Sequence, residues 1–250
     1  MIYGLYQSAA GMMTNEYRQN VIANNLANAQ TVGFKRDIPI FSERLRESML
    51  DQYNNPTNNL MESLSGGLWL GRTGTDFSDG PLSKTGNPLD VALEGPGFLM
   101  VQVNGRQLLT RDGRMMTDEF GRLVSVTDGA AMLSRAGSPI VLDRNGGEIT
   151  ITSDGRIHQD GREVGRLGLT DVEDYRTLRK DGNGRFTSMS DERIEAVARV
   201  HSGFVESSAV QPVHELTAMI EASRAFQINA RMISLQDEML GRLVNQVPRI

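Results

Sequence analysis

Histidine, cysteine and paired acidic residues most often carry protein chemistry, and in this sequence they form no reactive pattern. His158, His201 and His214 lie far apart along the chain, without the spacing of metal ligands. The chain has no cysteine, which excludes disulfides, thiolate zinc sites and thiol nucleophiles. We therefore expect no catalytic residue, no metal and no cofactor.

One segment, residues 181–192, begins like a calcium-binding loop with the sequence DGN and has Glu192 at its twelfth position. Phe186, however, stands at the sixth position, where the sharp turn requires glycine, and Arg185 places a cation among the ligands. We interpret the segment as a polar turn. Neither a Gly-Lys-Ser/Thr phosphate loop nor the glycine-flanked serine of a hydrolase occurs. The sequence thus favours a protein that is not an enzyme.

Three asparagines, Asn24, Asn25 and Asn28, are the other polar residues that could have a specific role. Asparagine is a poor helix former, yet these three cluster in a predicted helix. Two explanations stay open, one being capping or fraying of the last turns and the other amide hydrogen bonds between neighbouring subunits.

Helices are predicted at both ends of the chain. Residues 2–28 contain no proline, and apolar residues recur there at intervals of three and four. Residues 210–247 form the second predicted helix, with Pro212 in its first turn. Apolar residues lie seven apart along it, a repeat that favours a packed or supercoiled helix: Met219, Phe226, Ile233, Leu240 and Val247.

The second helix is apolar on more than one face, because Ile220, Ile228, Met232, Leu235 and Met239 widen the stripe. Two pairing helices would leave part of this surface free, and exposed apolar stripes usually mark contacts with other chains. The alternative, a helix buried against its own β domain, is about equally consistent with the pattern.

Turn signals organise the middle of the chain. Glycines recur every eight residues from Gly105 to Gly137, several of them in Asn-Gly or Asp-Gly pairs typical of tight hairpins. Short strand-like runs lie between or beside them, at residues 89–93, 98–103, 123–126, 140–142 and 149–151. Residues 37–50 could instead hold a short helix, with Phe41 and Leu45 on one face.

The predicted fold class is therefore α+β, with N- and C-terminal helices pairing as a helical hairpin or coiled coil around a central antiparallel β-rich domain. We expect four regions: an N-terminal helix at 1–30, an extended connector at 31–80, the β-rich domain at 81–205 and a C-terminal helix at 206–250.

Composition narrows the function. The net charge is −5 with no basic stripe, so a nucleic acid partner is not expected. No run of 18 apolar residues occurs, so we expect no membrane insertion. The first residues lack a basic stretch followed by a long apolar run, so no cleaved signal peptide is expected.

Motifs at both ends make a resemblance specific. Residues 8–12 (SAAGM), 19–28 (QNVIANNLAN) and 31–36 (TVGFKR) resemble the N-terminal signature of bacterial flagellar axial proteins, the rod and hook family. Residues 206–213 (ESSAVQPV) and 219–229 (MIEASRAFQIN) look like its C-terminal signature. Residues 80–93, 95–98 and 109–113 resemble the segment of larger rod and hook proteins, and 164–169 with 171–175 look more like the proximal-rod branch than the distal-rod branch.

This resemblance implies a structural subunit of the flagellar basal-body rod, which assembles through its terminal helices into the drive shaft that transmits torque across the periplasm. It implies export through the type III apparatus without signal cleavage, and it implies other rod subunits and copies of the same chain as partners. The alternatives are a distal-rod protein and a secreted β-rich hydrolase or adhesin module. The predicted assembly interface comprises Ile22, Asn24, Asn25, Leu26, Asn28, Phe34, Met219, Phe226, Asn229, Ile233 and Leu240.

Overall fold

The computed structural model describes residues 2–43, 68–189 and 192–246 and confirms the α+β class. The chain divides into two compact units. The helical unit comprises residues 1–27, 37–75 and 212–250, and the β unit comprises residues 28–36 and 76–211. The predicted connector at 31–80 is thus divided between the two units. Its middle, residues 37–75, belongs to the helical unit, and its two ends, residues 31–36 and 76–80, belong to the β unit.

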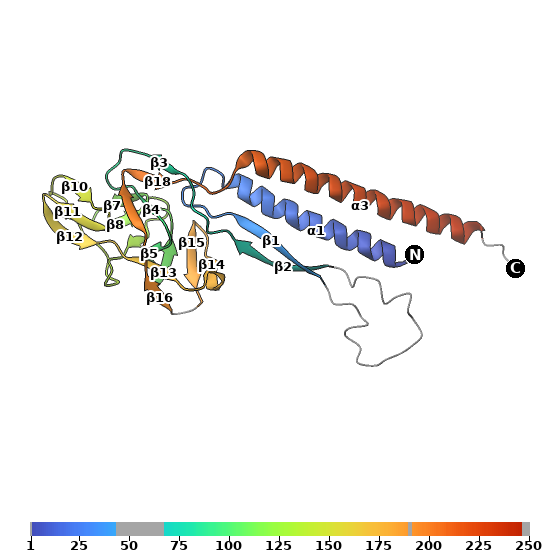
Figure 1. Ribbon diagram of the computed structural model, residues 1–250, viewed down its shortest axis with the longest axis horizontal. Coiled ribbons are helices and arrows are strands. Elements are labelled where there is room, and N and C mark those ends of the chain that lie inside the picture. The colour runs from blue at the N-terminus through green and yellow to red at the C-terminus, as the bar shows by residue number, and fades with distance from the viewer. Residues whose placement is uncertain (1, 44–67, 190–191, 247–250) are drawn as a thin grey trace. The chain divides into compact units, whose positions relative to one another are not determined.

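The helical unit contains α1 (Ile2–Ala27) and α3 (Pro212–Gln246), which lie side by side in Figure 1. It also contains β1 (Asp37–Glu43) and β2 (Leu68–Thr75), an antiparallel pair that contacts α1. Both helices have nearly the predicted bounds. None of the described helices is long and apolar enough to span a bilayer.

The short helix considered for residues 37–50 is wrong for the part that the structure describes, because residues 37–43 form β1. Ile38, Ile40 and Phe41 are β-branched or aromatic residues that favour a strand, and Pro39 is tolerated in an edge strand beside a bulge. The register indeed shifts between Pro39 and Phe41. Residues 44–50 lie outside the described residues.

The β unit contains short antiparallel strands, as the turn pattern predicts. Its largest sheet has the path β14-β15-β6-β5-β9-β8-β7, to which β13 and β16 attach, and the other strands form smaller groups. The strands are β3 (Leu82–Lys84), β4 (Val91–Glu94), β5 (Phe98–Val103), β6 (Arg106–Thr110), β7 (Met115–Thr117), β8 (Leu123–Ser125), β9 (Ala131–Met132), β10 (Ile149–Ile151), β11 (Arg156–Gln159), β12 (Arg162–Arg166), β13 (Leu169–Val172), β14 (Leu178–Lys180), β15 (Arg185–Ser188), β16 (Arg193–Glu195), β17 (Arg199–Ser202) and β18 (Phe204–Glu206).

Two apolar clusters form the core of this unit. The larger is aliphatic and is built mainly by the strands between β4 and β11, with Leu99, Leu123 and Ile157 fully buried. The smaller contains Phe98 and Phe186, against which Phe77 and Tyr175 pack. Alternating burial along short strands produces these clusters, because successive side chains of a strand point to opposite faces.

The eight-residue glycine spacing has two structural causes. Gly105, Gly121, Gly129 and Gly137 adopt positive φ, as tight turns require. Gly113 does not; a Cβ there would lie 1.9 Å from the carbonyl oxygen of Val91, so this position needs glycine for close backbone approach. Residues 140–142, expected as a strand, make one isolated bridge, between Val141 and Arg122, and backbone hydrogen bonds at Ile140 and Leu142.

Candidate assembly interface

The inner face of α3 carries the predicted seven-residue repeat. Met219, Phe226, Ile233 and Leu240 are all half-buried, and Ala222, on the same face, is fully buried. The spacing fits a helix that packs one stripe against a neighbour. These four predicted residues therefore share one face, and their role between subunits stays a prediction.

Two glycines of α1 meet two amides of α3. A Cβ at Gly11 would lie 2.8 Å from Nδ2 of Asn229, and a Cβ at Gly4 would lie 2.9 Å from Nε2 of Gln236. In both contacts the residue numbers add up to 240, which means that the two helices run antiparallel. The predicted residue Asn229 thus contacts α1 of its own chain.

The opposite face of α3 is apolar as well, and it is exposed. We call it the outer stripe. Its side chains recur at intervals of three, four and eight residues, so they follow one side of the helix. Ile228, for example, is 64% exposed. The members are Val213, Leu216, Ile220, Ile228, Met232, Leu235 and Met239. The apolar surface left free is therefore this stripe rather than the predicted heptad residues.

The three asparagines have different surroundings. Asn25 is buried and pairs with the backbone of Asp37, donating from Nδ2 to the carbonyl oxygen at 2.8 Å and accepting at Oδ1 from the amide at 2.9 Å. Its amide therefore joins α1 to β1 within one chain. Asn28 accepts from the Thr31 hydroxyl at 3.2 Å, and Asn24 is exposed.

Three predicted residues near the end of α1 are turned inward. Ile22 is buried, Leu26 is half-buried, and Phe34 is buried in the β unit. The Lys180 ammonium lies 4.1 Å from the centre of the Phe34 ring, a cation–π contact. Phe34 therefore stabilises its own chain in this structure.

A buried ion cluster formed by Lys35, Arg111 and Glu206 holds together the chain segments that follow α1 and precede α3. The Lys35 ammonium donates to Oε1 of Glu206 at 2.6 Å, and the Arg111 guanidinium donates to Oε2 at 3.2 Å. All three side chains are at most 2% exposed. Backbone bonds reinforce the cluster, since the Gly33 amide donates to the Glu206 carbonyl at 2.7 Å.

Further hydrogen bonds engage other donors of the ion cluster, although the buried Nε of Arg111 has no partner among the described residues. Lys35 also donates to the Ser78 carbonyl at 2.9 Å, and Arg111 donates to the Gly95 carbonyl at 2.9 Å and to Asp79 at 3.2 Å. Burial lowers the pKa of the Lys35 ammonium, and the neighbouring Glu206 carboxylate opposes that shift. The cluster is the kind of buried charge that persists only when paired and hydrogen-bonded.

Five of the motifs quoted above meet at this ion cluster: residues 31–36, 80–93, 95–98, 109–113 and 206–213. Sequence reasoning identified the motifs but missed Lys35, Arg111 and Glu206 as partners. A signal was present, since the motifs 31–36, 109–113 and 206–213 each carry a charged residue of the needed sign, but the sequence does not show which charges are buried.

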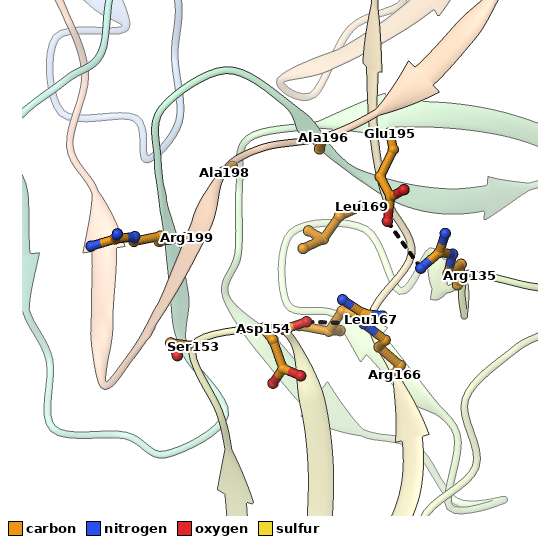
Figure 2. A pocket seen from close by; sticks show the side chains of 10 residues that line it. All are labelled: Arg135, Ser153, Asp154, Arg166, Leu167, Leu169, Glu195, Ala196, Ala198 and Arg199. Atoms are coloured by element: carbon orange, nitrogen blue, oxygen red, sulfur yellow. Dashed lines mark hydrogen bonds and ion pairs between the residues drawn. The ribbon is translucent and has the colours of Figure 1, made fainter.

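A recess of about 300 Å³ lies in the β unit, lined by Arg135, Arg166, Arg199, Asp154, Glu195 and neighbouring residues. Figure 2 shows Arg135 and Glu195 facing each other across one side, and their ion pair is 3.0 Å long. Arg166 donates to the Asp154 carbonyl at 3.0 Å. Ser153 contributes a hydroxyl to the lining, and no histidine is among the lining residues.

The histidines stay dispersed in the described structure. His201 bonds Glu94 at 2.7 Å, His158 belongs to β11, and His214 is exposed on α3. Within residues 2–43, 68–189 and 192–246, no group of three or more His, Asp or Glu side chains could hold a metal ion.

Comparison with known proteins matches three parts of the chain to flagellar families. Residues 5–35 match the flagella basal body rod protein family, residues 92–159 the flagellar hook protein FlgE/F/G D1 domain, and residues 201–247 the C-terminal family of flagellar basal body rod FlgEFG proteins. These matches cover α1, much of the β unit and α3.

Whole-chain similarity agrees with these matches. The chain is 34% identical to the flagellar basal-body rod protein FlgF of Caulobacter vibrioides, with 98% of each chain covered. It is 31% identical to FlgF of Salmonella typhimurium, with 97% of each covered, and 31% identical to FlgG of Buchnera aphidicola subsp. Schizaphis graminum, with 97% and 99% covered. The chain therefore belongs to the family of flagellar basal-body rod proteins that includes FlgF and FlgG, with the higher of these identities to an FlgF, and it is a structural rod subunit rather than an enzyme.

Proposed function

We propose that α1 and α3 pair as an antiparallel coiled coil. In this proposal residues 1–30 and 206–250, which contain the two helices, form the inner tube of the rod, and the β-rich domain surrounds that tube. The half-buried seven-residue repeat of α3 and its antiparallel contacts with α1 support this arrangement. Residues 31–36 and 206–211 then join the tube helices to the β unit, whose ion cluster fixes these two segments to each other.

The outer stripe of α3 is the observation that most directly supports assembly through the terminal helices. Seven apolar side chains follow one side of a helix whose other side already contacts α1. Their burial against neighbouring subunits contributes about 25 cal/mol per Å² of apolar surface removed from water. Helices of further copies of this chain are suitable partners because they carry the same stripe, and helices of other rod proteins are proposed as partners from the similarity of the chain to FlgF and FlgG proteins. The predicted residues Ile22, Asn24, Asn25, Leu26, Asn28 and Phe34 would position these helices.

The proposed route to the rod is export through the type III apparatus into the periplasm without cleavage of a signal peptide. The N-terminal residues are part of the folded subunit, since Gly4 and Gly11 contact α3. Removing this segment would expose the inner face of α3. Retention of α1 in the mature chain is thus consistent with its packing, and a proximal-rod position is consistent with the resemblance to FlgF.

Ile228→Glu tests this function in cells whose only copy of the subunit carries the change. We expect loss of swimming and loss of the subunit from purified basal bodies, because the charge would be buried between helices. Val197→Glu is the matched control, since Val197 is 82% exposed in the β unit. Normal assembly of the Ile228→Glu chain would refute the role of the outer stripe.

A further inference from the structure

The seven-residue repeat of α3 cannot by itself fix how far α3 slides along α1. Shifting the helix by seven residues replaces Phe226 by Met219 or Ile233 and leaves an apolar residue at each level. Burial of apolar area is therefore similar in the observed register and in either shifted one. A feature other than the seven-residue repeat must therefore select the observed register over the two shifted registers.

The two glycine–amide contacts differ from the repeat in shape and polarity. At Gly11 a Cβ would lie 2.8 Å from Nδ2 of Asn229, 3.2 Å from Cγ and 3.3 Å from Oδ1. Because Cγ itself is so close, turning only the terminal amide would not make room. At Gly4 only Nε2 of Gln236 comes that near, and Cδ is 3.6 Å away. The Gly11–Asn229 contact is the tighter of the two.

Both contacts weaken the helix pair locally. Glycine in a helix interior is less favourable than alanine. Oε1 of Gln236 is buried and accepts no hydrogen bond within the part of the chain that the structure describes, which leaves its desolvation uncompensated. Polar residues in a helix seam are known to lower stability while specifying register. The two glycine–amide contacts are consistent with this effect, since they lower the stability of the helix pair and distinguish one register from the others.

We infer that Gly11 and Asn229, supported by Gly4 and Gln236, are the residues that specify the register of α1 against α3. A shift of seven residues in one direction puts Gly11 opposite Ala222, and a shift in the other puts Asn229 opposite Arg18. Only the observed register places a glycine against both amides. The register thus depends on two small positions and two amides rather than on the apolar stripe.

An intrachain disulfide can report the register, because the chain has no native cysteine. The observed register places Arg18 opposite Ala222, so the parent for the test is the full-length chain with Arg18→Cys and Ala222→Cys, expressed in flagellated cells and mildly oxidised. Non-reducing gels with immunodetection measure the cross-linked fraction. This readout follows the chain itself and does not depend on motility.

We expect the parent to cross-link almost completely. Adding Gly11→Ala should lower the cross-linked fraction at least fivefold although it raises helix propensity, and Gly4→Ala should lower it less. Combining Gly11→Ala with Asn229→Gly should restore it. Gly241→Ala is the control, because no atom lies within 4 Å of a Cβ there. An uncross-linked parent, no loss with Gly11→Ala, or no recovery in the double variant would each overturn the inference.

Discussion

The ammonium of Lys35 and the carboxylate of Glu206 lie 2.6 Å apart in the interior, although the two residues are 171 positions apart in the chain. Lys35 follows α1 and Glu206 precedes α3, so this ion pair brings together the two ends of the β unit. Arg111 contributes the second cation. The pair thus joins the segment that follows α1 to the segment that precedes α3 within the β unit.

Glu206→Gln should destabilise the β unit by about 3–5 kcal/mol, because Lys35 and Arg111 would stay buried beside each other without the buried carboxylate that pairs with both, and only the half-exposed Asp79 would remain beside them. Urea unfolding of the purified chain, followed by circular dichroism, measures the loss. Glu195→Gln is the control, since its ion pair with Arg135 is exposed and should contribute at most about 1 kcal/mol. Equal losses in the two variants would contradict the proposed importance of the buried cluster.

Tyr175 should lose its phenolic proton at a pH above the ordinary range of a phenol, because its pKa is raised. Its burial and its hydrogen bond to Asp171 raise the pKa of the phenol from 10.0 to about 12. Because the folded pKa is raised, this phenol contributes stability below pH 10 that is lost as the pH rises from 10 to about 12. Absorbance at alkaline pH should show one late phenol that is absent in Tyr175→Phe. A late phenol that persists in Tyr175→Phe would show that another group causes it.

Gly113→Ala should prevent the β unit from folding, or cost on the order of 4 kcal/mol or more, because the added methyl would overlap the Val91 carbonyl. Gly182 provides the comparison. It has positive φ but open space around it, so Gly182→Ala should cost only about 1–2 kcal/mol. Thermal unfolding of the purified variants measures both. Similar losses would mean that backbone conformation, and not close approach, makes Gly113 necessary.

The terminal helices should exchange their amide hydrogens rapidly in the dilute, monomeric chain. Within the described part of α3, only Glu215 and Ala222 have buried side chains, and helices with little buried apolar surface open easily. Hydrogen exchange with peptide mass spectrometry should show fast exchange in residues 1–30 and 215–246 and slow exchange in β5 and β6. Full protection of both helices in the monomer would contradict assembly-coupled ordering.

Much of the fold could be predicted from local patterns. Apolar residues spaced three and four apart predict α1, and the seven-residue repeat predicts α3, both almost to their ends. The Asn104-Gly105 pair predicts the hairpin of β5 and β6. Residues 140–142 have the composition of a strand but make a single isolated bridge, between Val141 and Arg122, and no continuous ladder. Whether a short apolar run pairs depends on distant neighbours that its own residues do not specify.

The candidate site was less predictable. Sequence reasoning selected the heptad residues, such as Phe226, as the assembly surface, but the structure turns that face toward α1 and leaves Ile228 and its neighbours exposed. The partner face of a two-faced helix depends on the tertiary register, which a seven-residue repeat leaves ambiguous. The ion cluster was missed for a similar reason, because Lys35, Arg111 and Glu206 are distant in sequence.

Photo-cross-linking in assembled basal bodies tests the central claim, that the outer stripe of α3 contacts neighbouring rod subunits. A benzophenone amino acid replaces Ile220 or Ile228 on the stripe, or Val197 in the β unit as a control. We expect adducts with rod-family subunits from both stripe positions and markedly fewer from Val197. Basal bodies that contain the chain but give no adduct with another subunit at either stripe position would contradict it.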